Sequence, residues 1–136
     1  MVDFDRRGLI QTTVVGAAAA LGGAMPALAA GQLFVIAEVV AAPGKEKELR
    51  DLLVPFAAKS RAEPGCKIYT LHEVSAELKD GKYPSAPAGR FVTYELFVDR
   101  AGFDAHMTSP HLAELAPKLE GLLAKPFTQL LFEQSW

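Results

Sequence analysis

The pattern of hydrophobic and polar residues along the chain predicts four β-strands. The first segment is a nearly continuous apolar run with β-branched residues, which is typical of a strand buried on both faces. The second alternates between apolar and polar residues, as a strand with two unlike faces does. The predicted strands cover residues 32–41, 66–75, 90–98 and 126–135.

The first two connections between these strands differ in kind. Between Pro43-Gly44 and Pro64-Gly65, leucine and phenylalanine residues recur at helical spacing, and this predicts a long amphipathic helix. Residues 76–89 instead contain Asp80-Gly81, two prolines and several charges. We expect them to form a long, mobile hairpin loop that covers the mouth of a pocket.

Two further helices are predicted between the third and fourth strands. Asp99 has the residue type of an N-cap for a short helix over residues 100–108. Ser109-Pro110 places a cap residue before a proline at the first helical position, so another helix should begin there. Pro117 is expected to kink or delay that last helix.

The order of elements, β-α-β-β-α-α-β, predicts an α+β fold with a ferredoxin-like sheet and helices on one face. The first, third and fourth strands are apolar on both sides, so the second sheet face must also be covered. Another copy of the same sheet would cover it, which predicts a homodimer. For that face the pattern allows either Leu130 with Phe132, or Gln129 with Leu131.

Residues 1–30 are predicted to be an export signal that precedes the domain of residues 31–136. The paired Arg6 and Arg7 stand before a weakly apolar run rich in alanine and glycine, which ends in the small-residue sequence 27–30. This arrangement resembles a twin-arginine signal peptide, and it implies a periplasmic or secreted protein. An uncleaved membrane anchor is the alternative. Few Leu, Ile or Phe residues lie in the run, and this argues against stable membrane insertion.

The charge and the cysteine content of the chain limit which partners and bonds it can have. The 136-residue chain has a formal net charge of −2, and removal of residues 1–30 takes away two acidic and two basic residues and leaves it unchanged. No basic run is present, which argues against a nucleic-acid surface. The single cysteine, Cys66, cannot form an internal disulfide, and we expect it to be a small, partly buried apolar residue.

Several short segments together resemble the antibiotic biosynthesis monooxygenase domains. They are Pro-Gly-Lys-Glu at 43–46, Arg61 to Cys66, Tyr94 to Asp99, Ala105-His106 and Ser109-Pro110-His111. The resemblance implies a dimeric α+β barrel, and the family includes quinol oxygenases and haem-degrading enzymes. Haem-degrading relatives use an Asn on the first strand, which is absent here, and many relatives have a Trp where this chain has Phe97.

Three residues are the candidate catalytic groups of a quinol oxygenase. His106 shares a helix face with Phe103 and Met107, which predicts that it points toward the core. It is either the base, the role that the resemblance supports, or a histidine at the edge of the core bonded to a backbone carbonyl. His111 lies in the first turn of the next helix, where a neutral hydrogen-bonding role or simple exposure is expected. Glu95 lies in an apolar strand, so it is either a site acid or a structural partner of an arginine or a backbone amide.

Tyr69, Phe97 and Phe103 are the candidate substrate-binding aromatics. No cofactor is expected, since electron-rich quinols react with O₂ directly. No metal site is expected either, because His106 and His111 are separated by a helix break and no carboxylate lies at ligand spacing. The predicted activity is monooxygenation of a quinol or another hydroxylated aromatic. The alternatives are a non-catalytic dimeric binder of a small hydrophobic ligand and a haem-binding or haem-degrading protein.

Overall fold

The computed structural model describes residues 30–133, so the predicted signal sequence lies outside the described residues apart from Ala30. Four strands and three helices follow one another in the predicted order, with a short 3₁₀ helix, η2, after the last helix. The elements are β1 (Leu33–Val40), α1 (Glu46–Arg61), β2 (Cys66–Glu73), β3 (Arg90–Phe97), α2 (Arg100–Met107), α3 (Pro110–Leu115), η2 (Ala116–Leu119) and β4 (Thr128–Phe132).

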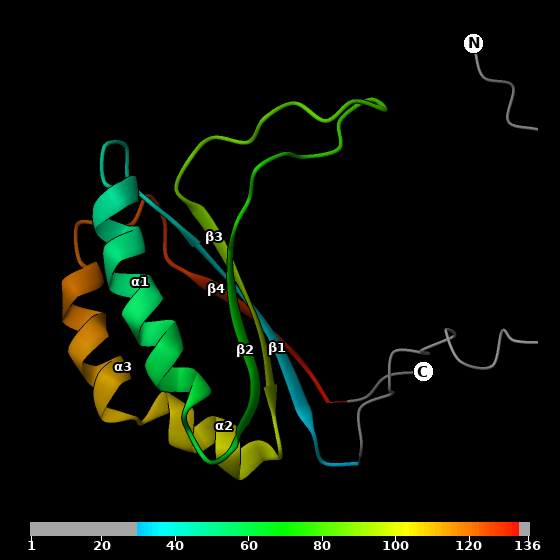
Figure 1. The fold of residues 1–136 in the computed structure, drawn as a ribbon, viewed down its shortest axis with the longest axis vertical. Helices are drawn as coiled ribbons and strands as arrows, with labels where there is room; N and C mark the ends of the chain where they lie inside the picture. Colours follow the sequence, from blue (N-terminus) through cyan, green and yellow to red (C-terminus); the bar gives the residue numbers. More distant parts are fainter. Residues whose placement is uncertain (1–29, 134–136) are drawn as a thin grey trace, which may run out of the picture.

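The strands form one antiparallel sheet in the order β2-β3-β1-β4. All three helices cover the same face of this sheet, and the opposite face has no helix over it (Figure 1). The ferredoxin-like α+β fold is therefore confirmed. Within the described residues, α1 is the longest helix at 16 residues, and no helix there is long and apolar enough to cross a bilayer.

Strand β1 shows how the sheet divides its two faces. Its residues alternate strictly between buried and half-buried, with Leu33, Val35, Ala37 and Val39 directed toward the helices. The prediction that this strand is buried on both faces is therefore met on only one face within a single chain. The difference arises because all the helices pack on one side.

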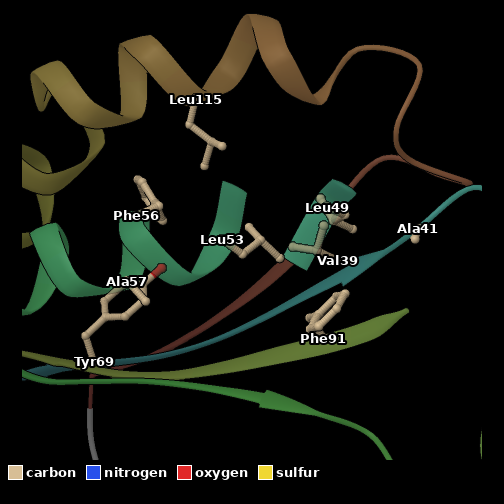
Figure 2. Packing of buried hydrophobic residues seen from close by; sticks show 9 residues of the cluster. All are labelled: Val39, Ala41, Leu49, Leu53, Phe56, Ala57, Tyr69, Phe91 and Leu115. Atoms are coloured by element: carbon tan, nitrogen blue, oxygen red, sulfur yellow. The ribbon is translucent and has the colours of Figure 1, made fainter. Parts of the chain in front are cut away.

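The main hydrophobic core lies between the inner sheet face and helices α1 and α3 (Figure 2). Figure 2 shows Leu115 of α3 above Phe56 of α1, with Tyr69 and Phe91 contributed by the strands below. The Phe56 and Tyr69 rings meet edge to face, with their centroids 6.1 Å apart. Burial of these aromatic and aliphatic side chains supplies most of the force that holds the helices on the sheet.

Both predicted helix starts after β3 are confirmed. The carboxylate of Asp99 accepts a hydrogen bond of 2.7 Å from the Gly102 backbone N–H, as an N-cap does. The Ser109 hydroxyl accepts one from the Leu112 N–H at the start of α3. Pro117 lies at the start of η2, so the helix tightens into 3₁₀ geometry where a kink was predicted.

Residues 76–89 form a paired hairpin arm, which differs from the expectation of a pocket cover. Asp80 and Gly81 both have positive φ, 51° and 72°, which is the backbone of a type I′ turn. Isolated bridges join Ala76 to Ser85 and Lys79 to Lys82. The arm extends to the side of the sheet opposite the helices (Figure 1). None of its residues lines the cavity that lies between the sheet and the helices and is described below.

The outer sheet face carries a row of aromatic side chains. The ring of Phe34 stacks on that of Tyr94 at 6.4 Å and lies 5.9 Å from that of Phe132. The register pairs Leu130 with Ile36 and Phe132 with Phe34, so these two residues of β4 belong to the outer face. Gln129 and Leu131 have the opposite orientation. The structure thus selects the first of the two registers that the sequence allowed.

A close approach of two glycines holds α2 against the turn that follows α1. A Cβ atom built on Gly65 would lie 2.6 Å from the Cα atom of Gly102, which is shorter than real contacts allow. In addition, the Gly65 carbonyl accepts a hydrogen bond from the Val98 N–H. This contact fixes where α2 lies relative to the residues just before Gly65.

We expect Gly65→Ala to lower the free energy of unfolding by about 1–3 kcal/mol, because backbone must move to admit the methyl group. Gly102→Ala should also fail to stabilise the protein, although alanine favours an isolated helix by about 1 kcal/mol. Urea denaturation measures both effects, with Lys67→Ala on the exposed side of β2 as the control. A Gly65→Ala variant as stable as the wild type would contradict the close packing.

Candidate functional site

A cavity of about 80 Å³ lies between the inner sheet face and the helices. Most of its wall is apolar, and the polar residues among those lining it are Thr93, Glu95, His106, Gln129 and the Tyr69 hydroxyl. Met107 and Phe127 line the cavity and are also exposed, so they lie where it meets the surface. The site is a small, mostly apolar cavity with a few ionisable groups in its wall.

Glu95 lies in the centre of β3, with its side chain directed into the cavity wall and only 1% exposed. Its Oε1 atom accepts a hydrogen bond of 2.7 Å from the Thr93 hydroxyl, and its Oε2 atom is buried without a hydrogen-bond partner. Burial raises the pKa of the carboxyl group, and the hydrogen bond from Thr93 and the neighbouring His106 only partly oppose this. Burial therefore makes the protonated form of Glu95 more favourable than it is for a solvated carboxyl group.

Tyr69 faces Glu95 across the β2–β3 pair and lines the same cavity. Burial raises the pKa of its hydroxyl, and the charge of Glu95 raises it further. The hydroxyl therefore stays protonated at neutral pH and can donate a hydrogen bond there.

His106, on α2, is the most deeply buried ionisable group with direct access to the cavity after Glu95. Its side chain is 3% exposed and lines the cavity. Three aromatic rings surround it, those of Phe97 at 5.3 Å, Tyr69 at 5.6 Å and Phe56 at 5.8 Å between centroids. The predicted inward orientation of His106 agrees with this placement.

The Glu63 carboxylate joins the two histidines of the helical layer. Its Oε1 atom lies 2.9 Å from Nδ1 of His106 and 2.6 Å from Nε2 of His111. An ionised carboxylate only accepts hydrogen bonds, so Nδ1 of His106 carries a hydrogen and donates it to Glu63. The contact of Glu63 with His111 is an ion-pair contact. For a neutral His106 ring, the remaining nitrogen, Nε2, is then an unprotonated acceptor.

His111 belongs to this hydrogen-bonded group and does not line the main cavity. Its Nε2 atom also lies 3.3 Å from the hydroxyls of Ser60 and Ser109. The ring is half-buried and its centroid is 6.2 Å from that of His106. Its position in the first turn of α3 agrees with a hydrogen-bonding role and not with simple exposure.

The three predicted substrate-binding aromatics separate into two groups. Tyr69 lines the cavity. Phe97 and Phe103 instead meet edge to face at 5.5 Å in a second small core cluster with Leu33 and Val35, away from the cavity wall. Phe97 packs against the His106 ring without lining the cavity itself. The aromatic residues of the cavity wall, besides Tyr69, are Phe56, Phe91 and Phe127.

Glu63 and Thr93 are the site residues that sequence reasoning did not identify. Glu63 lies in the Arg61–Cys66 segment, where the only signal was the resemblance of that segment to a family motif. Its distance from His106 is 43 positions along the chain, so no local spacing connects them. In the sequence, no carboxylate lies at ligand spacing from the two histidines, and no metal site was expected for that reason. The fold nevertheless brings a carboxylate to them, because the turn after α1 places Glu63 next to both rings.

Cys66 is half-buried next to this group and is a poor nucleophile. Burial raises the pKa of its thiol to about 11, and the negative charges of Glu63 and Glu95 add to the effect. The predicted role as a small, partly buried apolar residue agrees with these surroundings.

Comparison with known proteins places this arrangement in a family. A model of the family described as antibiotic biosynthesis monooxygenase matches residues 32–118. The protein named "Putative monooxygenase Rv0793" of Mycobacterium tuberculosis is 33% identical over 92 residues, which cover 68% of this chain and 80% of that protein. A Synechocystis protein, sll1783, is 31% identical over 94 residues, but this chain spans only 57% of its length.

Solved structures agree with the sequence matches. The structure of Rv0793 superposes with a TM-score of 0.62 at 30% identity, and covers 74% of this chain and 92% of its own. PA3566 of Pseudomonas aeruginosa superposes with a TM-score of 0.58 at 31% identity over the same shares. The chain therefore belongs to the antibiotic biosynthesis monooxygenase family, in which such relatives support a monooxygenase-like role at the level of the family.

Proposed function

We propose that this protein is a cofactor-independent monooxygenase that oxygenates a quinol or another hydroxylated aromatic with O₂. The observation that carries the proposal is His106, a buried imidazole in the wall of an apolar cavity whose Nδ1 atom is held by Glu63. Electron-rich phenols need little from a protein beyond a base, a proton donor and a dry chamber. These three are the features that the cavity combines.

The first step is loss of the phenolic proton. His106 Nε2 accepts it, and the resulting imidazolium is stabilised by the Glu63 carboxylate at Nδ1. Glu63 acts here as a positioning residue, because it fixes the tautomer and the ring orientation without touching the substrate. The phenolate is electron-rich enough to transfer an electron to O₂, and the two radicals combine at a ring carbon that bears hydrogen.

The second step converts the ring peroxide into a quinone. The peroxide takes the proton from His106, and the ring C–H proton then returns to His106 as the O–O bond breaks. One oxygen atom becomes the new carbonyl and the other leaves as hydroxide, which a protonated carboxyl group converts into water. The raised pKa of Glu95 suits it to this donation, and His106 afterwards restores its proton. One phenol and one O₂ thus give one quinone and one water.

The cavity also limits the substrate. At about 80 Å³ the cavity is smaller than the roughly 150 Å³ that holds benzene in an engineered protein core, so even a one-ring substrate requires movement of Met107 or Phe127 at the mouth. The walls offer aromatic faces for stacking and few groups that could bind a charged substituent.

We further propose that the protein works as a homodimer outside the cytoplasm. The outer face of the sheet carries Tyr94, Leu130 and Phe132, which are too exposed and too close together for a monomer in water. A second copy of this face is the complementary apolar surface, as a two-fold dimer provides. The export part of the proposal rests on Arg6, Arg7 and the apolar run that follows them.

We expect His106→Ala to lower the rate of oxygen uptake with a reactive quinol by about a hundredfold or more, the usual contribution of one general base. Glu63→Gln should lower kcat by less and leave KM nearly unchanged, because it removes orientation and not contact with the substrate. An oxygen electrode and a panel of one-ring and two-ring quinols measure both. Glu48→Gln, on the exposed side of α1, is the matched control.

An unchanged rate in His106→Ala would remove its role as the base. If the wild-type protein binds quinols but consumes no oxygen with any of them, the non-catalytic binder becomes the better description. Activity is expected to survive treatment with a chelator and to need no added flavin.

We expect Tyr94→Glu with Leu130→Glu to convert a dimer into a monomer, because the paired faces would bury four carboxylates without partners. Sedimentation velocity measures the change. Val54→Glu is the control, since Val54 is 54% exposed and belongs to α1, which covers the other face of the sheet (Figure 1). A wild-type protein that sediments as a monomer would overturn the dimer.

We expect Arg6→Lys with Arg7→Lys to leave the precursor in the cytoplasm, since twin-arginine export depends on the arginine pair. Cell fractionation and the mass of the mature N-terminus measure this outcome. Lys45→Arg, a charge-conserving change in the domain, is the control. Unaltered export of the double variant would exclude the twin-arginine route.

A further inference from the structure

We propose that Glu63, His106 and His111 form a binding site for a divalent transition-metal ion of the zinc class. The three side chains come from the turn after α1, from α2 and from α3, and each offers one ligand atom. These atoms all lie within 4.8 Å of one another. Two imidazoles and one carboxylate are a donor set that zinc accepts, with a fourth position left for water.

The charge at the site favours a cation. Oε1 of Glu63 accepts a hydrogen bond from His106 and lies 2.6 Å from Nε2 of His111, while Oε2 is buried with no hydrogen-bond partner. Among residues 30–133, no lysine or arginine forms an ion pair with this carboxylate, and its only partners of that kind are the two histidines. A divalent ion would neutralise this charge.

The present distances are those of hydrogen bonds, and a small expansion would admit an ion. Ligand atoms bound to one tetrahedral zinc at about 2.0–2.1 Å lie about 3.3 Å apart. The Glu63 oxygen lies 2.6 Å and 2.9 Å from the two nitrogens, so each gap must widen by several tenths of an ångström. The side chains of Glu63 and His111 are each 14% exposed, so solvent and ions can reach the group from outside the main cavity.

Metal binding changes the tautomer of His106. A metal on Nδ1 takes the place of the hydrogen there, and in a neutral ring that hydrogen must move to Nε2, the nitrogen that faces away from Glu63. An Nε2–H donates a hydrogen bond but cannot accept a proton. We therefore expect the bound ion to inhibit proton abstraction in the cavity, and this consequence, unlike the metal site itself, rests on the proposed function.

The site is tested by titrating the purified chain with Zn²⁺ in competition with a chromophoric chelator. One equivalent should bind, and Glu63→Gln and His111→Ala should each weaken binding on the order of a hundredfold or more. His72→Ala is the matched control, because it removes the one histidine outside the group. Circular dichroism of each variant shows whether it has folded.

A measurement on the wild-type protein keeps the test independent of the variants. Co²⁺ in place of Zn²⁺ should give the intense ligand-field absorption of a four-coordinate nitrogen and oxygen site. Absence of a stoichiometric Zn²⁺ complex in the wild type, or binding that is lost with His72→Ala and kept with His111→Ala, would overturn the site. If Zn²⁺ binds but no quinol is oxygenated, the proposed function fails and the metal site stands.

Discussion

The contacts of the Glu63 carboxylate with His106, a hydrogen bond, and with His111, an ion-pair contact, are the interaction on which the candidate site depends. They join the turn after α1 to α2 and α3. Because the carboxylate is largely buried and no lysine or arginine in the described part of the chain pairs with it, the loss of either imidazole would weaken the compensation of a desolvated charge. The same contacts fix the tautomer of the histidine that lines the cavity. Stability and chemistry therefore depend on one group.

The helices can meet at Glu63 because the fold brings them to one side of the sheet. The antiparallel order β2-β3-β1-β4 leaves every crossover on the same face (Figure 1). The Gly65–Gly102 contact then sets the height of α2 above the turn that carries Glu63. Side chains larger than hydrogen at either glycine would push the two apart. Backbone packing thus determines a distance between side chains that the sequence does not place near each other.

Patterns that act over a few residues were sufficient to predict the elements. The caps at Asp99 and Ser109 and the interruption at Pro117 depend on local backbone chemistry, and the structure shows each where it was predicted. The inward orientation of His106 also followed from helical spacing to Phe103 and Met107. The membership of Glu63 in the site did not, because it depends on how a turn meets two helices 43 or more positions away.

Sequence patterns also could not predict which aromatic residues line the cavity. Tyr69 and Phe97 are both inward-facing residues of neighbouring strands, yet only Tyr69 reaches the cavity, since Phe103 of α2 covers Phe97. Likewise, period-two alternation could not choose between the two faces of β4, because Leu130, Leu131 and Phe132 are all apolar. Pairing with β1 decides it.

The environment of Cys66 has a consequence for the redox behaviour of the protein. Disulfide exchange and alkylation proceed through the thiolate, and a thiol with a pKa of about 11 has only about one molecule in ten thousand in that form at neutral pH. Thiol reagents and oxidised glutathione should therefore modify it very slowly. Burial, together with the charges of two nearby acidic residues, thus slows reaction at the sulfur, and cross-linking between chains through their single unpaired cysteine should be slow under oxidising conditions.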